Sequence, residues 1–363
     1  MEPDELAALG LYDPSEVHAD LRLELLSYLM ALGATAEELL AYRDMLPALA
    51  AVLAIRGGPV MTLEEASTQS GLSTDGVRRL TRAAGFPDPE PGTPVYTKGF
   101  VELAAGMSAV AVMFGEDACY QLLRVLGSAM DRVADAVVSA FLVNVGPAAQ
   151  REDPAGLGLA RANVEAAALL PLVAPALDTL LRQHLLTAQR MVLVDANADQ
   201  VGYETRSLVV GFIDLVGSTE MGEQLSISEL GAVLTSFEHL ATDTVTGGGG
   251  RVVKLIGDEI MYTAPDAHSA CSIALDLAEA FGDHPVIPPV RAGLAGGQVL
   301  LRDGDVFGPV VSLAARAVKV AQPGDIVTTI ELATEAGLRY EPCGRHRLKG
   351  ISGEVELCRL MRA

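Results

Sequence analysis

The sequence predicts an all-helical domain over residues 1–195, a junction at 196–206, and an α+β domain over residues 207–363. Two observations lead to this division. Up to residue 195 the apolar residues recur at helical spacing, whereas from residue 207 short apolar runs alternate with helical stretches. The second part also opens in the order strand, helix, strand, strand, helix, strand. That order is typical of an α+β sheet covered by helices on one face.

The composition excludes several classes of protein. Half of the 363 residues are apolar, and the formal net charge is −21, with both halves of the chain acidic. An acidic surface argues against nucleic-acid binding. The four scattered cysteines form no CxxC pair, which indicates reduced thiols in the cytoplasm. No signal peptide is evident, and no run reaches the ~18–20 uncharged apolar residues of a membrane span. The nearest run is 136–150, so we expect a cytoplasmic protein without a membrane span.

The first domain should begin with two helices. Apolar residues recur every fourth position from Val17 to Leu29 and predict a helix over about 6–33. A capping-box pattern at Thr35 and Glu38 opens a second helix, expected to end near Ile55.

Residues 61–86 have the pattern of a helix-turn-helix, with two short helices around Gly71 and Ser73 at the start of the second. Its arginines, Arg78, Arg79 and Arg82, could contact DNA phosphates. Residues 61–98 nevertheless hold more acidic than basic side chains, so we favour a helical hairpin used for packing.

Residues 100–150 are unusually apolar and predict helices buried on several sides. Two interpretations stay open: the core of a bundle or dimer, or a cavity for an apolar ligand such as a fatty acid. A later helix, over 177–195, leads to the second domain and is a natural transmission element. Histidine changes charge near neutral pH, so His184 on this helix could act as a switch, although a solvated surface histidine is the simpler interpretation.

In the second domain we expect helices at about 218–245, 267–281, 310–321 and 330–336. Strands are expected at 207–214, 251–256, 260–264, 286–296, 298–302, 306–307 and 326–329, with a strand pair over 345–360.

The most informative stretch is the first strand of this domain and the turn after it. An apolar run from Val209 ends in one carboxylate, Asp214, and Gly217, Ser218 and Thr219 then open a helix. A helix N-terminus offers free backbone amides to an anion, and a carboxylate beside it can hold a divalent cation. An ordinary capped turn would have the same pattern, so this stretch alone does not distinguish a metal and phosphate site from a structural turn.

Two further stretches supply the missing chemistry. Asp258 lies at the tip of a predicted hairpin that can pair beside the first strand, which would bring Asp214 and Asp258 together. Two carboxylates repel one another unless a cation bridges them. With the glycine turn, they predict a two-metal site for a nucleoside triphosphate. Arg316 is the single charge in an apolar helix; a charge in such a segment needs an anion, and a phosphoryl group fits a guanidinium.

Together these stretches resemble the catalytic domain of class III nucleotidyl cyclases. The motifs are Phe212-x-Asp214-x-x-Gly217-x-Thr219, Lys254-x-x-Gly257-Asp258, and Asp305-x-x-Gly308 followed by Ala314-Ala315-Arg316. The resemblance covers about residue 203 to the end and implies a ferredoxin-like, palm-type βαββαβ fold. It also implies an adenylyl cyclase, which converts ATP to 3′,5′-cyclic AMP and pyrophosphate by two-metal catalysis at a homodimer interface.

The resemblance assigns roles by position. Asp214 and Asp258 would hold two Mg²⁺ or Mn²⁺ ions per site with help from the Ile213 carbonyl. Lys254 and Asp305 would read adenine, and Arg316 would stabilise charge on the reacting phosphate. The remaining substrate contacts would be Phe212 and the turn residues Leu215, Val216, Gly217, Ser218 and Thr219. The two metal-binding carboxylates would come from one chain, and Lys254, Asp305 and Arg316 from its partner.

Ser312 departs from the family pattern, which has asparagine four residues before the arginine. Serine reaches less far toward the ribose, and losing one hydrogen bond to a neutral group costs about 0.5–1.5 kcal/mol. We therefore expect lowered activity. The alternative is a weak or inactive homologue that acts as a nucleotide- or lipid-binding regulator. The first domain resembles the regulatory half of soluble mycobacterial-type cyclases, which responds to pH and binds fatty acids.

Overall fold

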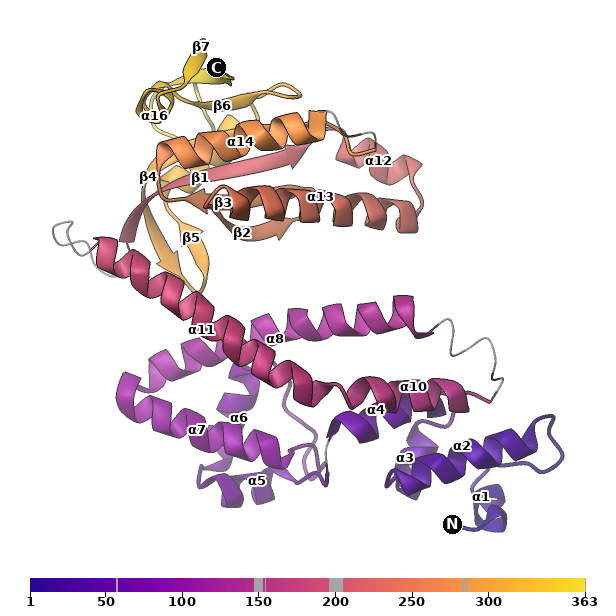
Figure 1. Cartoon of the computed structure of the whole chain (residues 1–363). Coiled ribbons are helices and arrows are strands. Elements are labelled where there is room, and N and C mark those ends of the chain that lie inside the picture. Colours follow the sequence, from indigo (N-terminus) through magenta and orange to yellow (C-terminus); the bar gives the residue numbers. More distant parts are fainter. Residues whose placement is uncertain are drawn as a thin grey trace. The chain divides into compact units, whose positions relative to one another are not determined.

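The computed structural model describes residues 1–56, 58–146, 153, 155–195, 205–282, 284 and 286–362, with the backbone alone for 190–195 (Figure 1). The chain divides into two compact units, Met1–Ala188 and Gln189–Ala363, called here the helical unit and the sheet unit. Helix α11 ends at Asp195, where the first domain is expected to end. Residues 196–204 of the expected linker, 196–206, lie outside the described residues.

The helical unit contains helices alone among its described elements. They are α1 (Pro3–Ala8), α2 (Ala19–Ala31), α3 (Ala36–Ala41), α4 (Leu46–Arg56), α5 (Leu63–Ser70), α6 (Thr74–Ala83), α7 (Lys98–Phe114), α8 (Glu116–Asn144), α10 (Leu157–Ala167) and α11 (Leu170–Asp195).

Each of the two expected N-terminal helices is in fact a pair. The capping box at Thr35 and Glu38 forms as predicted and starts α3. Helix α3 ends at Ala41, and α4 begins one residue before Pro47. Proline is tolerated only in the first turn of a helix, because its ring clashes with the preceding turn and it has no N–H to donate. A continuous helix through Pro47 is therefore excluded.

The hairpin of α5 and α6 forms where the sequence predicts it. The Ser73 hydroxyl accepts the Gly76 amide at 3.1 Å and caps α6. Arg82 donates two hydrogen bonds to Asp88, at 2.9 and 2.7 Å, and the Arg79 guanidinium lies 4.5 Å from the centre of the Tyr120 ring. Both arginines are used inside the unit, which agrees with a packing role for the hairpin.

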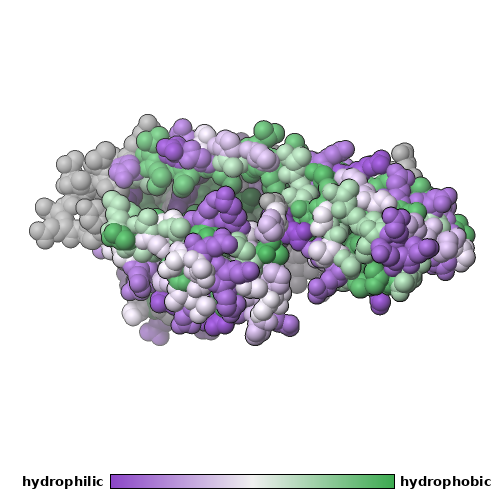
Figure 2. Space-filling view, turned by 90° about the horizontal axis from the view of Figure 1, so that it is seen from below, coloured by the Kyte–Doolittle hydropathy of each residue, from purple (hydrophilic) through white to green (hydrophobic). Residues whose placement is uncertain are grey.

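Helix α8 is not buried on several sides within one chain, contrary to the prediction. Its buried residues are Cys119 and Leu123, near its start. Hydrophobic residues lie among polar ones on the surface in Figure 2. His184 is exposed on α11, as expected of a surface histidine. The large apolar side chains exposed on α8 and α11 are Leu122, Met130, Val133, Val137, Val138, Leu142, Val143, Leu170, Leu172, Val173, Leu180, Leu181, Leu185 and Leu186.

One helical stretch among the described residues, Leu157–Gln189, has the length and composition that can cross a membrane. An 18-residue window in it has a mean hydropathy of 1.6, and none of that window is buried. The sequence-based count named 136–150 instead and is corrected here. It required an uncharged run, whereas Asp178 and Arg182 interrupt this one. These two residues form an i,i+4 ion pair of 2.8 Å, which reduces the cost of both charges.

The sheet unit alternates strands and helices in the predicted order. Its first half contains β1 (Thr205–Leu215), α12 (Ser218–Gln224), α13 (Ile227–Gly247), β2 (Arg251–Ile256), β3 (Glu259–Ala264), α14 (Ala267–Gly282) and β4 (Val290–Arg302). Its second half contains β5 (Asp305–Phe307), α15 (Pro309–Ala317), β6 (Ile326–Thr329), α16 (Ile330–Ala336), β7 (Arg339–His346) and β8 (Val355–Met361). The helix expected over 218–245 is two helices, because Ser226 and Glu229 form a capping box that starts α13.

The strands form one sheet with the order β2-β3-β1-β4-β6-β8-β7, and β5 pairs with β4. Strand β1 lies between β3 and β4 and is antiparallel to both. The first four strands therefore have the ferredoxin-like order that the βαββαβ pattern implies. The strands expected at 286–296 and 298–302 are one continuous strand, β4.

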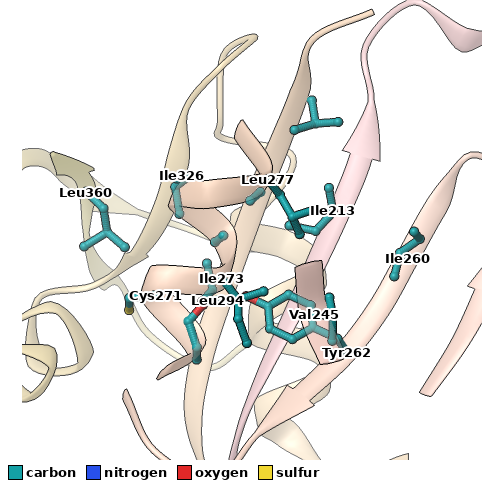
Figure 3. Packing of buried hydrophobic residues seen from close by; sticks show 14 of the residues in the cluster. Ile213, Val245, Ile260, Tyr262, Cys271, Ile273, Leu277, Leu294, Ile326 and Leu360 are labelled. Carbon is teal, nitrogen blue, oxygen red and sulfur yellow. Dashed lines mark hydrogen bonds between the residues drawn. The ribbon is translucent and has the colours of Figure 1, made fainter. Parts of the chain in front are cut away.

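Both faces of the sheet are covered, so the expectation of helices on one face is incomplete. On one face, Ile213, Tyr262 and Leu294 join side chains of α13 and α14, such as Val245 and Leu277, in the main core (Figure 3). On the other face, alternate residues of β1, Val210 and Phe212, pack with Ala314 and Val318 at α15. Asp214 continues this second series, which places its side chain on the α15 face.

Candidate active site

Asp214 and Asp258 lie at one end of the sheet because β1 pairs with β3. In this register Asp214 is opposite Glu259. The amide of Leu215 donates to the carbonyl of Asp258 at 3.1 Å, so the main chain ties the end of β1 to the hairpin tip. At that tip Gly257 has a φ of 64°, a left-handed conformation that glycine adopts at little cost. The structure thus brings the two carboxylates that the sequence singled out together on one chain.

The turn after Asp214 provides fewer free amides than expected. Gly217 is left-handed, with φ 74° and ψ 19°, and is the N-cap of α12. The amides of Leu215 and Val216 donate to the carbonyls of Asp258 and Pro289, at 3.1 and 3.0 Å. They are therefore not free to bind a triphosphate, which corrects the sequence-based assignment. The amides left at the N-terminus of α12 are those of Gly217, Ser218 and Thr219.

The Asp214 carboxylate is buried, with 6% of the residue exposed, and two cations face it. The Nη2 of Arg291 lies 2.6 Å from Oδ2, and its Nε donates to the same oxygen at 2.8 Å. The Nζ of Lys319 lies 3.6 Å from this oxygen. Arg291 is opposite Asp214 in the β1–β4 register, so the sheet itself fixes this pair. A buried carboxylate needs such partners, because burying an unpaired charge is costly.

The other two carboxylates of the site, Asp258 and Glu259, also interact with their neighbours. The Ser218 hydroxyl donates to Oδ2 of Asp258. Burial, together with the negative charges of Asp214 and Asp258, raises the pKa of Glu259, and Lys319 opposes this shift in part. Negative charge therefore accumulates at this end of the sheet.

These groups line an open pocket of about 530 Å³ that also includes the Gly217 turn. Among the described residues no cluster of three or more His, Cys, Asp or Glu side chains could hold a metal by itself. Mg²⁺ and Mn²⁺ need fewer protein ligands, because one or two carboxylates suffice when substrate phosphates and water complete the shell. Two carboxylates next to free amides and two cationic side chains therefore fit a metal–polyphosphate.

Lys254 and Asp305 come together from β2 and β5. The Nζ of Lys254 lies 2.6 Å from Oδ2 of Asp305, and both side chains are partly exposed. Burial raises the pKa of Asp305, but hydrogen bonds from Lys254 and from the Val306 amide outweigh it, so this pKa lies below its usual value. Neither residue lines the pocket at Asp214. On one chain, the carboxylates of the pocket and the Lys254–Asp305 pair therefore lie at separate places.

Arg316 and Ser312 lie on the exposed side of α15, whereas Ala314 and Ala317 face the sheet. Within a single chain Arg316 is therefore exposed, and its pairing with a phosphoryl group stays a prediction. Among the described residues no ion pair of Arg316 is found, and neither Arg316 nor Ser312 lines the pocket at Asp214.

Phe212 is 5% exposed and packs with Val210 and Met261. It does not line the pocket, and the geometry of this chain gives no support to a substrate contact at Phe212. Ile213 is fully buried in the main core, and its carbonyl as a metal ligand stays a prediction.

Sequence reasoning missed Arg291, Lys319 and Glu259. Arg291 lies 77 residues from Asp214 along the chain and meets it only through strand register. Glu259 adjoins a motif that was recognised, so its position next to Asp258 was the one signal that could have found it.

Comparison with known proteins identifies the family. Residues 7–189 match the adenylate cyclase regulatory domain. The uncharacterized protein Rv2212 of Mycobacterium tuberculosis is 36% identical over 91% of this chain and 86% of its own length. An adenylate cyclase of Streptomyces coelicolor is 31% identical over 75% of this chain and 70% of its own. A pH-sensitive adenylate cyclase of M. tuberculosis is 29% identical over 94% of this chain and 88% of its own. The chain belongs to the class III nucleotidyl cyclases that carry an N-terminal adenylate cyclase regulatory domain.

Proposed function

We propose that the chain is an adenylyl cyclase that forms 3′,5′-cyclic AMP and pyrophosphate from ATP. The observation that carries the proposal is the meeting of Asp214 and Asp258 beside the free amides of the Gly217 turn. Two Mg²⁺ or Mn²⁺ ions bound by these carboxylates would polarise the triphosphate and make the ribose 3′-hydroxyl a better nucleophile. The amides of Gly217, Ser218 and Thr219 and the Arg291 guanidinium bind phosphate oxygens and hold the chain of phosphates in place.

The Lys254–Asp305 pair supports adenine as the base. The lysine ammonium is a donor for adenine N1, and the aspartate carboxylate is an acceptor for the 6-amino group. Guanine presents a donor at N1 and an acceptor at O6, so it would place donor against donor and acceptor against acceptor. Because Asp305 is ionised and already bonded to Lys254, the pair is oriented before the base arrives.

The division of the site supports a homodimer. Asp214 and Asp258 line one pocket, while Lys254, Asp305 and Arg316 lie elsewhere on the chain with polar groups exposed. In a twofold dimer the exposed Arg316 of one protomer meets the phosphates held by its partner, which gives two equivalent sites. The exposed apolar side chains of α8 and α11 support dimerisation, because a second copy would remove them from water.

Regulation by the helical unit is the second part of the proposal. Helix α11 ends at Asp195, ten residues before β1 begins in the sequence, and therefore links the two units along the chain. An open pocket of about 320 Å³, lined by apolar residues such as Leu80, Met107 and Val112, is the place in this unit for an apolar ligand. Binding there changes activity by shifting the equilibrium between two arrangements of the catalytic dimer.

The test is production of cyclic nucleotide by the purified full-length chain with Mn²⁺ and either ATP or GTP, from pH 5.5 to 8, with and without residues 1–200. We expect cyclic AMP from ATP, with a pH profile that changes on truncation. The Ser312→Asn variant should be more active than the native chain, since asparagine reaches further toward the ribose. A native chain that makes no cyclic AMP, rescued by Ser312→Asn, would establish the inactive-regulator alternative. A flat pH profile and no effect of truncation would remove the regulatory part.

A further inference from the structure

Lys319 reaches the metal-binding carboxylate from an unexpected direction. It lies two residues beyond α15, which packs against β4 at Gly293. A Cβ at this glycine would lie 2.3 Å from the Val318 amide nitrogen and 2.5 Å from the Ala314 carbonyl oxygen. The lack of a side chain at Gly293 thus lets the end of α15 lie directly on the sheet. From this fixed helix end the Lys319 side chain, 55% exposed, places its Nζ 3.6 Å from Oδ2 of Asp214.

Of the two cations that face Asp214, Lys319 is the more distant and the more exposed. Arg291 already contacts Oδ2 through two nitrogens at 2.6 and 2.8 Å and is fixed by strand register. Lys319 is a second cation on the same oxygen, at the longer distance of 3.6 Å, on a flexible and exposed stem. A divalent cation bound to Asp214 would repel the ammonium, which then leaves this oxygen. The pocket that Lys319 lines also contains the Gly217 turn, where phosphates are expected.

We propose that Lys319 is a polyphosphate ligand supplied by the same protomer as Asp214 and Asp258. Without nucleotide it is the counter-ion of Asp214. When a metal–polyphosphate binds, the ammonium moves from the Asp214 oxygen to a phosphate oxygen, and no proton is transferred. The inference deepens the proposed function, since the polyphosphate is the triphosphate of the nucleotide. It goes beyond the proposed function because it assigns Lys319 a role in binding the polyphosphate, before any bond of the nucleotide is broken.

The test is binding of two inert probes to the full-length chain, Mn²⁺ alone by electron paramagnetic resonance and inorganic tripolyphosphate with Mn²⁺ by calorimetry. Removal of a partly exposed ion pair changes affinity by about 2- to 5-fold. Lys319→Ala should therefore bind Mn²⁺ alone about 2- to 5-fold more tightly, because a competing cation is gone. It should bind tripolyphosphate more weakly by a similar factor. Lys319→Arg, which keeps the charge, should remain close to the native chain.

Lys98→Ala is the matched control, because Lys98 also forms an exposed ion pair, with Glu102, but lies in the helical unit. It should change neither affinity. Unchanged affinities in Lys319→Ala, or a change of both in the same direction, would overturn the proposal. The proposed function can fail independently. A native chain that binds both probes but forms no cyclic AMP is not an adenylyl cyclase. The affinities of the native chain and of Lys319→Ala for the two probes would still test the role of Lys319.

Discussion

Gly211 on β1 lies opposite Tyr262 on β3, and the tyrosine ring fills the space that a side chain at Gly211 would need. A Cβ there would lie 2.2 Å from Cε1 and 2.4 Å from Cζ of the ring. The ring is fixed in turn, since its hydroxyl donates to the Ala270 carbonyl at 2.7 Å. This contact lies three residues from Asp214 and keeps β1 and β3 in the register that the site requires.

Gly211→Ala should therefore destabilise the sheet unit by about 1–3 kcal/mol, the usual cost of overpacking a core. The measurement is the midpoint of thermal unfolding of the full chain by calorimetry. Gly231→Ala is the control, because Gly231 lies in α13 with no heavy atom within 4 Å of a Cβ. There alanine should stabilise the helix by about 0.5–1 kcal/mol. Equal effects of the two substitutions would contradict the role assigned to the Tyr262 ring.

Base selection should depend on Lys254. Lys254→Ala removes the donor for adenine N1 and leaves Asp305 without its 2.6 Å partner. Loss of a charged hydrogen bond costs about 1.5–3 kcal/mol, so kcat/KM for ATP should fall about 10- to 100-fold. Activity with GTP should fall less, because guanine gains nothing from a donor at this position. The ratio of kcat/KM values for the two nucleotides measures the effect. A proportional loss with both would show that Lys254 does not read the base.

Two inactive variants should restore one another. Asp258→Asn damages the carboxylate half of the site and Arg316→Ala the other half, so neither homodimer should make cyclic AMP. Co-expression with different affinity tags produces mixed dimers, each with one intact site. With one of its two sites intact, the mixed dimer should have about half of the native activity, and the unfractionated mixture from random pairing about a quarter. The measurement is cyclic AMP production by the doubly purified mixed dimer. No activity in that dimer would show that one chain supplies the whole site.

Stability of the helical unit should depend on pH through Asp153. Its carboxylate accepts the amides of Ala155 and Gly156, at 2.9 and 3.1 Å, and that of Gly158 at the start of α10. Burial raises the pKa of Asp153, but these backbone hydrogen bonds outweigh it and lower the pKa below its usual value.

Because the pKa is lower in the folded state, the stabilisation is complete above the unfolded value of ~3.9 and is lost as pH falls through the folded value. Asp153→Asn should cost about 1 kcal/mol at pH 7, and the difference from the native chain should shrink toward pH 3. Thermal unfolding across this range measures it, with Asp131→Asn, exposed on α8, as the control. A difference that is the same at pH 7 and pH 3 would mean that the charge of Asp153 is not involved.

The order of elements in the sheet unit could be predicted because each strand and helix has a local signal. The apolar run before Asp214 and the glycine before Asp258 are examples, and both lie where strands end. The break between α12 and α13 was missed because Ser226 and Glu229 lie within a continuous helical periodicity. Their hydrogen bonds to the backbone, and not hydrophobicity, start the second helix.

The two cationic side chains that face Asp214 could not be predicted in the same way. Arg291 and Lys319 meet Asp214 only through pairing of β1 with β4 and packing of α15 at Gly293, and neither has a local pattern. Phe212 shows the opposite situation. It belongs to a recognised motif, yet the alternation of β1 turns it into the core. Arg316 was singled out because its helix is apolar, but the two buried residues of that helix are Ala314 and Ala317, and Arg316 lies on the exposed side.

The turn after Asp214 is held by hydrogen bonds between main-chain atoms and not by the side chains of the site. The amides of Leu215 and Val216 donate hydrogen bonds to the carbonyls of Asp258 and Pro289. Every residue type except proline has such an amide, so these bonds do not depend on side chains. Replacement of Asp258 therefore removes a charge and leaves these main-chain bonds in place, whereas replacement of Asp214 also leaves Arg291 without its partner carboxylate. In the proposed homodimer, a gene duplicate that has lost Asp258 would keep its shape and still complete the site of an intact partner.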